Sequence, residues 1–78
     1  MAVLRLFASA REAAGTGCDE IDAATVGAVL DEACRRYGDG FASVLQGCRV
    51  WRNGEPTTAV DTVGRHDEVA VLPPVSGG

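Results

Sequence analysis

The residues of this chain with the clearest chemical potential stand at its C-terminal end, where positions 71–78 read VLPPVSGG. Gly77 and Gly78 carry no side chain, so they could pass through a slot that is too narrow for any other residue. The carboxylate of Gly78 could thus be delivered into the active site of another protein. Once such a carboxylate is converted to a mixed anhydride with AMP, a sulfur nucleophile can replace the AMP. The ending therefore predicts group transfer on a tether, and the alternative is a frayed end without a function.

Positions 73–78 are predicted to form an extended functional tail. Pro73 and Pro74 restrict the backbone and favour an extended exit from the folded body. At roughly 3.3 Å per residue, such a tail could reach about 20 Å. Val75 offers a small apolar anchor, and Ser76 is small enough to follow the glycines through a narrow slot.

The composition argues against several other kinds of site. All seven cations are arginine and the net charge is −4, so the chain lacks the basic footprint of a nucleic-acid-binding protein. The three cysteines are widely spaced and His66 is the only histidine, so neither a metal site nor a disulfide framework is predicted. No apolar stretch approaches the length of a membrane span, and Arg5 interrupts the short apolar run near the start. We therefore expect a soluble, cytoplasmic protein with no metal and with neither a nucleic-acid nor a membrane partner.

The elements that must position the tail begin with an alternating stretch. Residues 2–8 predict a strand with Val3, Arg5 and Phe7 on one face. Residues 18–22 predict a second strand, antiparallel to the first and on an exposed edge. The segment between them is expected to contain at most one helical turn.

The clearest helix is predicted over residues 26–37. Thr25 suits its N-cap, and Gly38 fits the position just past its end. Its apolar residues recur at intervals of three and four and form one stripe: Val26, Val29, Leu30, Ala33 and Tyr37. A short helical turn is expected within residues 41–47.

The second half of the chain predicts two strands and a weaker third. Residues 49–54 predict a strand, with Trp51 in the core, that ends in an Asn-Gly turn. Residues 57–60 predict the weaker strand. Residues 67–74 predict the last strand, and its run from Val69 to Leu72 is apolar on both faces, which is typical of a central strand. The prolines should end its pairing.

The order of these elements predicts an α+β fold. Strand, strand, helix and then two or three strands pack most economically as a mixed sheet of about four to five strands, with one main helix across it. This is the β-grasp, or ubiquitin-like, architecture. It would occupy residues 1–72, and the tail would follow.

Two stretches of the chain resemble a known family. RLFASAREAAG, at residues 5–15, resembles the opening of the small subunit of molybdopterin synthase, and DEVAVLPPVSGG, at residues 67–78, resembles that family's ending. Asn53 and Gly54 stand where the family has its Asn-containing turn. The resemblance covers nearly the whole chain.

The resemblance implies a sulfur carrier. A ubiquitin-activator-like adenylating enzyme would form a transient glycyl-AMP at Gly78, and a sulfur-transfer protein would convert it to a thiocarboxylate, a 1-thioglycine. The tail would then enter the large subunit of molybdopterin synthase and give sulfur to a cyclic pterin phosphate, which forms the molybdopterin dithiolene. The chain itself would bind no cofactor. It would be a non-catalytic, sulfur-donating subunit, because the catalytic residues are expected on the large subunit.

The resemblance also implies a partner-binding surface around the tail. Its members would be Phe7, Arg11, Leu72, Pro73, Pro74 and Val75. Leu72 stands where the family commonly has Phe, so one docking contact is expected to be smaller. Core and strand-end packing is the alternative role for the five apolar members, and Arg11 could be an ordinary surface cation.

Three other functions stay open at this point. Related carriers that share the fold and the Gly-Gly end serve thiamin or cysteine biosynthesis, although the thiamin carriers lack the PPVSGG form and the cysteine carriers have one proline in place of two. A ubiquitin-like modifier would instead join Gly78 to lysines of target proteins. A passive interaction domain would use neither glycine.

Overall fold

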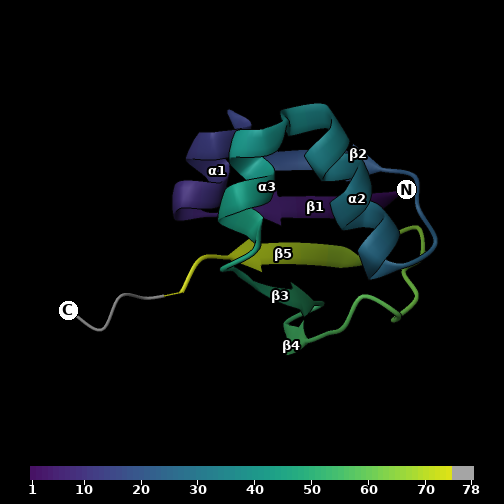
Figure 1. Ribbon diagram of the computed structural model, residues 1–78. Helices are drawn as coiled ribbons and strands as arrows, with labels where there is room; N and C mark the ends of the chain where they lie inside the picture. Colours follow the sequence, from purple (N-terminus) through teal and green to yellow (C-terminus); the bar gives the residue numbers. More distant parts are fainter. Residues whose placement is uncertain (75–78) are drawn as a thin grey trace.

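The computed structural model describes residues 1–74 (Figure 1). The predictions for Val75, Ser76, Gly77 and Gly78 lie outside the described residues. In chain order the elements are β1 (Ala2–Leu6), α1 (Ala8–Ala14), β2 (Cys18–Ile21), α2 (Val26–Tyr37), α3 (Asp39–Leu45), β3 (Arg49–Arg52), β4 (Glu55–Pro56) and β5 (Glu68–Leu72). No helix within residues 1–74 combines the length and the apolar character needed to cross a membrane.

The five strands form one mixed sheet in the order β2-β1-β5-β3-β4. β1 and β5 pair in parallel, whereas the other three pairings are antiparallel. The last strand therefore lies in the centre of the sheet, between the first strand and β3. The predicted β-grasp fold is confirmed, as are the exposed edge position of β2 and the central position of β5.

The core lies between one face of this sheet and the helices. Leu4, Leu6, Val69 and Val71 point into it from the two central strands and are fully or almost fully buried. The helices contribute Ala10, Val26, Val29, Ala33 and Phe41. The alternate residues of β1 and β5 stay half-buried or exposed, so the opposite face of the sheet is open.

The main helix, α2, begins and ends where the sequence predicts. The hydroxyl of Thr25 accepts a hydrogen bond of 3.1 Å from the Ala28 N–H, and Gly38 follows the last turn at a φ of 91°. Two further N–H groups of the first turn donate to a distant loop. Val26 donates to the carbonyl of Asp61 and Gly27 to the carbonyl of Ala59, both over 2.9 Å. The loop before β5 therefore completes the N-terminal cap of α2.

The strand predicted over residues 57–60 is wrong. The carboxylate of Asp61 accepts hydrogen bonds from the Thr57 hydroxyl over 2.6 Å and from the Thr58 N–H over 3.1 Å. These bonds fold the segment into a turn, and the strand that pairs with β3 is instead the two-residue β4. α1 and α3 are full seven-residue helices where single turns were expected, and α3 begins at Asp39.

Candidate functional site

The site is built around the point where the chain leaves the sheet. β5 ends at Leu72, and its neighbours hold that end from both sides. Leu72 lies opposite Arg49 of β3, and the N–H of Phe7 donates to the carbonyl of Val71 over 3.3 Å. Pro73 and Pro74 follow outside any strand, so the predicted end of pairing at the prolines is confirmed.

Five residues surround this exit and define what we call the exit patch: Arg49, Trp51, Leu72, Pro73 and Pro74. Together they line a surface hollow of about 450 Å³. A second hollow, of about 250 Å³, lies on the neighbouring surface and shares Arg49 and Trp51 with the first. Trp51 therefore stands between two depressions, and the patch combines apolar groups with one cation.

The placement of Trp51 corrects the sequence prediction of a core residue. Trp51 lies opposite Ala70 of β5, whereas its neighbour Val50 lies opposite the buried Val71. Val50 thus occupies the helix-facing side of β3, and Trp51 occupies the open side, where it is half-buried. Since both residues are apolar, the alternation that would reveal their sides is missing from the sequence. The prediction missed both Trp51 and Arg49 as members of the exit patch.

The structure brings together only part of the predicted partner-binding set. Leu72, Pro73 and Pro74 lie in the exit patch. Phe7, which is 40% exposed, is joined to the end of β5 through its backbone. Arg11 on α1 instead lies over Gly17 and lines a separate hollow with Glu12 and Thr16. Among residues 1–74, none lines both the hollow of Arg11 and that of the exit patch.

The ion pairs of the described residues leave Arg49 without a carboxylate partner. Arg5, Arg35 and Arg36 each form an ion pair with a carboxylate, whereas Arg49 forms none within residues 1–74. Arg49 is exposed, and it belongs to a chain with a net charge of −4. An acidic group on a partner would therefore find a cation that is available for pairing at the exit.

The titratable groups with altered pKa lie outside the exit patch. Hydrogen bonds from Asn53 and from the Gly64 N–H lower the pKa of Asp67, and the Thr57 hydroxyl does so for Asp61. Burial raises the pKa of the Cys34 and Cys48 thiols, which favours the unreactive thiol form. The patch itself has Arg49 as its one ionisable side chain. The geometry of these five residues is therefore suited to docking.

The chain is similar in sequence and in fold to known proteins. The ThiS family model matches residues 4–78. Small archaeal modifier protein 1 of Haloferax volcanii is 35% identical, over 95% of this chain and 97% of its own. Its crystal structure matches with a TM-score of 0.88 over 99% of this chain and 98% of its own, at 32% identity.

Two other solved structures share the fold. The solution structure of small archaeal modifier protein 1 from Methanosarcina acetivorans matches with a TM-score of 0.88 at 26% identity, over 99% of this chain and 95% of its own. The Pyrococcus furiosus protein assigned as molybdopterin converting factor, subunit 1, matches with a TM-score of 0.84 over 95% of this chain and 97% of its own. Its identity of 24% carries the likeness of fold alone.

Proposed function

Because this chain belongs to the ThiS family, we propose that it is a ubiquitin-like sulfur carrier whose reacting group is the carboxylate of Gly78. The observation that carries the proposal is the exit of the chain. Its last strand is held in the centre of the sheet by β1 and β3 and ends at the exit patch, four residues before Ser76 and six before Gly78. The described part of the chain thus ends at a surface suited to docking, and the sequence that follows ends in two glycines.

The proposed chemistry has two steps, and both need a partner enzyme. The Gly78 carboxylate attacks the α-phosphorus of ATP and releases pyrophosphate, which leaves a glycyl-AMP. A sulfur donor, hydrosulfide in the simplest case, then attacks the glycyl carbon and expels AMP, so that a thiocarboxylate remains. The adenylating enzyme and the sulfur-transfer protein supply the acid–base groups, because the exit patch has none.

The acceptor we propose is a cyclic pterin phosphate bound to the large subunit of molybdopterin synthase. Two sulfurs would form the dithiolene of molybdopterin, and each thiocarboxylate that gives one would return to a carboxylate. The chain would act in the cytoplasm as a sulfur-donating subunit of that complex. The exit patch would dock on the large subunit while Gly77 and Gly78 enter its active site. The likeness of fold to the Pyrococcus furiosus protein supports this choice of acceptor. A carrier for thiamin or cysteine biosynthesis would use the same first two steps.

A second candidate is a protein modifier, which the 35% identity to a small archaeal modifier protein favours. In this case the amine of a target lysine would attack the glycyl carbon of the glycyl-AMP, expel AMP and form an isopeptide bond. The chain contains no lysine, so it could not form a polymer on itself through lysine side chains.

Intact mass spectrometry after coexpression with an adenylating enzyme separates these functions. A carrier gains the mass difference of one sulfur replacing one oxygen, and tandem spectra place it at Gly78. A modifier instead yields conjugates at the summed mass of chain and target. A variant lacking Gly77 and Gly78 should show neither product. If the wild-type chain also shows neither product, it is neither a carrier nor a modifier.

The acceptor needs its own test. Purified thiocarboxylate should be mixed with a molybdopterin synthase large subunit and its pterin precursor. Formation of dithiolene with loss of the thiocarboxylate supports the molybdopterin assignment. A thiocarboxylate that survives unchanged beside an active large subunit would overturn it and leave the other sulfur pathways.

A further inference from the structure

β2 is an outer strand of the sheet, so some of its backbone N–H and C=O groups point away from the sheet. What binds these groups does not depend on the proposed function. Within residues 1–74, β1 is the one strand that pairs with β2. The N–H of Leu6 donates to the carbonyl of Gly17 over 3.0 Å, which sets the phase of the antiparallel ladder. Asp19 and Ile21 therefore direct their backbone groups toward β1, whereas Cys18 and Glu20 direct theirs outward. Such outward groups are what a further strand would pair with.

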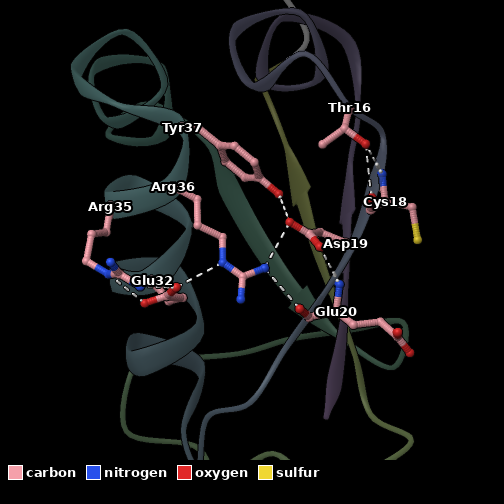
Figure 2. Close-up of polar contacts among 8 residues, drawn as sticks. All are labelled: Thr16, Cys18, Asp19, Glu20, Glu32, Arg35, Arg36 and Tyr37. Carbon is pink, nitrogen blue, oxygen red and sulfur yellow. Dashed lines mark hydrogen bonds and ion pairs between the residues drawn. The ribbon is translucent and has the colours of Figure 1, made fainter.

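Side chains of this chain bind all four of these outward groups (Figure 2). The Thr16 hydroxyl donates to the Cys18 carbonyl over 3.0 Å and accepts from the Cys18 N–H over 3.4 Å. Asp19 Oδ1 accepts from the Glu20 N–H over 2.8 Å. Arg36 Nη1 reaches across from α2 and donates to the Glu20 carbonyl over 3.1 Å.

Arg36 is held in this position from two sides. Its Nε donates to Glu32 of the same helix over 2.9 Å, and its Nη1 donates to Asp19 Oδ2 over 3.1 Å. The Tyr37 hydroxyl also donates to Asp19 Oδ2, so a second side chain of α2 reaches the strand. Arg36 therefore spans the gap between helix and strand and covers the outer edge there (Figure 2).

We propose that Thr16, Asp19 and Arg36 close the β2 edge against strand pairing, and that the strand they exclude is β2 of a second copy of this chain. Two copies can meet antiparallel with Cys18 opposite Cys18. In that register Glu20 faces Thr16 and Asp19 faces Gly17, so no two carboxylates stand directly opposite each other. Directly opposed like charges would otherwise oppose the pairing. The closed edge keeps association away from β2 and leaves the exit patch open for partners.

The test opens the edge and reads the pairing at Cys18. Cys34 and Cys48 are replaced by serine, so that Cys18, which is exposed, is the one thiol left. On this background Thr16→Val removes the hydroxyl from Cys18, and Arg36→Met removes the guanidinium from Glu20. Diamide takes up the two hydrogens when two Cys18 thiols form a disulfide, and the dimer is counted by mass. The double variant should crosslink about tenfold faster than the background chain, the factor that corresponds to the loss of one or two net hydrogen bonds.

A matched variant and a rescue make the result specific. Arg35→Met removes the neighbouring arginine, which binds Glu32 and does not touch β2, so it should leave the crosslinking rate unchanged. Glu20→Pro, added to the double variant, puts a proline ring on the outward side of β2 without breaking the β1 ladder. Because the ring blocks a second strand even where the Glu20 N–H is already bound by Asp19, the rate should return to background. Circular dichroism checks that each chain is folded. If the double variant does not fold, Thr16→Val alone should still crosslink faster than the background chain.

A folded open-edge variant that crosslinks no faster than the background chain would overturn the proposal. The proposal would also be overturned if Glu20→Pro did not change the crosslinking rate of the open-edge variant. Sedimentation at millimolar concentration gives an independent reading, because the double variant should approach the mass of a dimer while the Arg35→Met chain stays monomeric.

Discussion

Asn53 and Asp67 lie fourteen positions apart in the chain and are joined by a hydrogen bond of 2.9 Å from Asn53 Nδ2 to Asp67 Oδ1. The other amide atom of Asn53, Oδ1, accepts from the Glu68 N–H over 2.8 Å. Asn53 thereby ties the turn after β3 to the first residue of β5. Its own φ is 52°, in the left-handed region, where Asn is more readily accommodated than most residues. One residue thus shapes the turn and anchors the strand that leads to the exit.

Substitution of Asn53 should separate these two contributions. Asn53→Gly loses both side-chain hydrogen bonds but keeps an easy left-handed backbone, so the free energy of unfolding should fall by about 1–2 kcal/mol. Asn53→Ala loses the same bonds and adds backbone strain, so the fall should be larger by roughly 1 kcal/mol. Urea unfolding followed by circular dichroism measures both variants. Equal losses would show that the left-handed φ contributes nothing.

Gly27 is required by a close contact at the first turn of α2. A Cβ at this position would lie 3.0 Å from the carbonyl oxygen and 3.1 Å from the Cβ of Ala59. The glycine N–H also donates to that same carbonyl, so the loop cannot withdraw without losing the bond. Gly27→Ala should therefore lower the free energy of unfolding by about 1–2 kcal/mol, because the overpacking outweighs the higher helix propensity of alanine.

Gly40 provides the matched control for that prediction. It also lies in a helix, α3, but a Cβ there would meet no atom within 4 Å. Gly40→Ala should raise the free energy of unfolding by up to about 1 kcal/mol through helix propensity alone. Thermal unfolding of both variants gives the comparison. A stabilising Gly27→Ala would contradict the proposed role of the Ala59 contact.

The parts of the fold that the sequence predicts are those governed by local signals. The apolar stripe, Thr25 and Gly38 predict α2. Asn53 and Gly54 predict the turn after β3. No local signal predicts the conformation of residues 57–60, because it depends on Asp61 and on distant N–H groups of α2. The full length of α1 is not predictable from local signals either, since its N-cap, Phe7, makes no side-chain capping hydrogen bond. The helix instead buries Ala10 in the core.

The exit patch is predictable only in part for a related reason. The prolines and Leu72 are adjacent in the chain, so the sequence places them together. Arg49 and Trp51 reach the patch through the pairing of β3 with β5, which no local signal reveals. The side of β3 on which Trp51 lies is set by the register of that pairing.

Asp19 should make the stability of the protein depend on pH in the acid range. The hydrogen bond from Tyr37 is the main cause that lowers the pKa of Asp19, and the Glu20 N–H and Arg36 act in the same direction. Since the folded pKa lies below the unfolded value of about 4, the contribution is fully present above that value and is lost as the pH falls through the folded pKa. The free energy of unfolding should therefore decline between about pH 5 and pH 2.

Asp19→Asn should make that decline less steep and should lower stability at neutral pH. Glu32, Asp61 and Asp67 also have a lowered pKa, so part of the decline should persist. Glu12→Gln is the control, because Glu12 forms no ion pair or side-chain hydrogen bond within residues 1–74. Urea titrations at a series of pH values measure the slopes. Identical slopes for wild type and Asp19→Asn would contradict the role given to Asp19.

Trp51 should be an anchor of the exit patch in the reaction with the adenylating enzyme. Trp51→Ala removes a half-buried aromatic side chain that lines two hollows, so the KM for this chain as substrate should rise on the order of tenfold. ATP–pyrophosphate exchange measures the rate, and circular dichroism checks the fold. Val60→Ala is the control, since Val60 is 82% exposed and lies outside the patch. If Val60→Ala raised the KM as much as Trp51→Ala does, the result would contradict the role of Trp51 as an anchor.

Arg49 should add an electrostatic contribution to the same encounter. Arg49 lies opposite Leu72 and forms no ion pair within residues 1–74. Arg49→Glu reverses its charge, so association with an acidic partner surface should slow, and the effect should weaken as salt screens the charges. Arg65→Glu makes the same change of net charge in the loop before β5, at the opposite end of that strand from the exit. Stopped-flow association at low and high salt compares the two variants. If both slow association equally, the overall charge of the chain governs the encounter; if Arg49→Glu alone does so, the attraction is local to the exit patch.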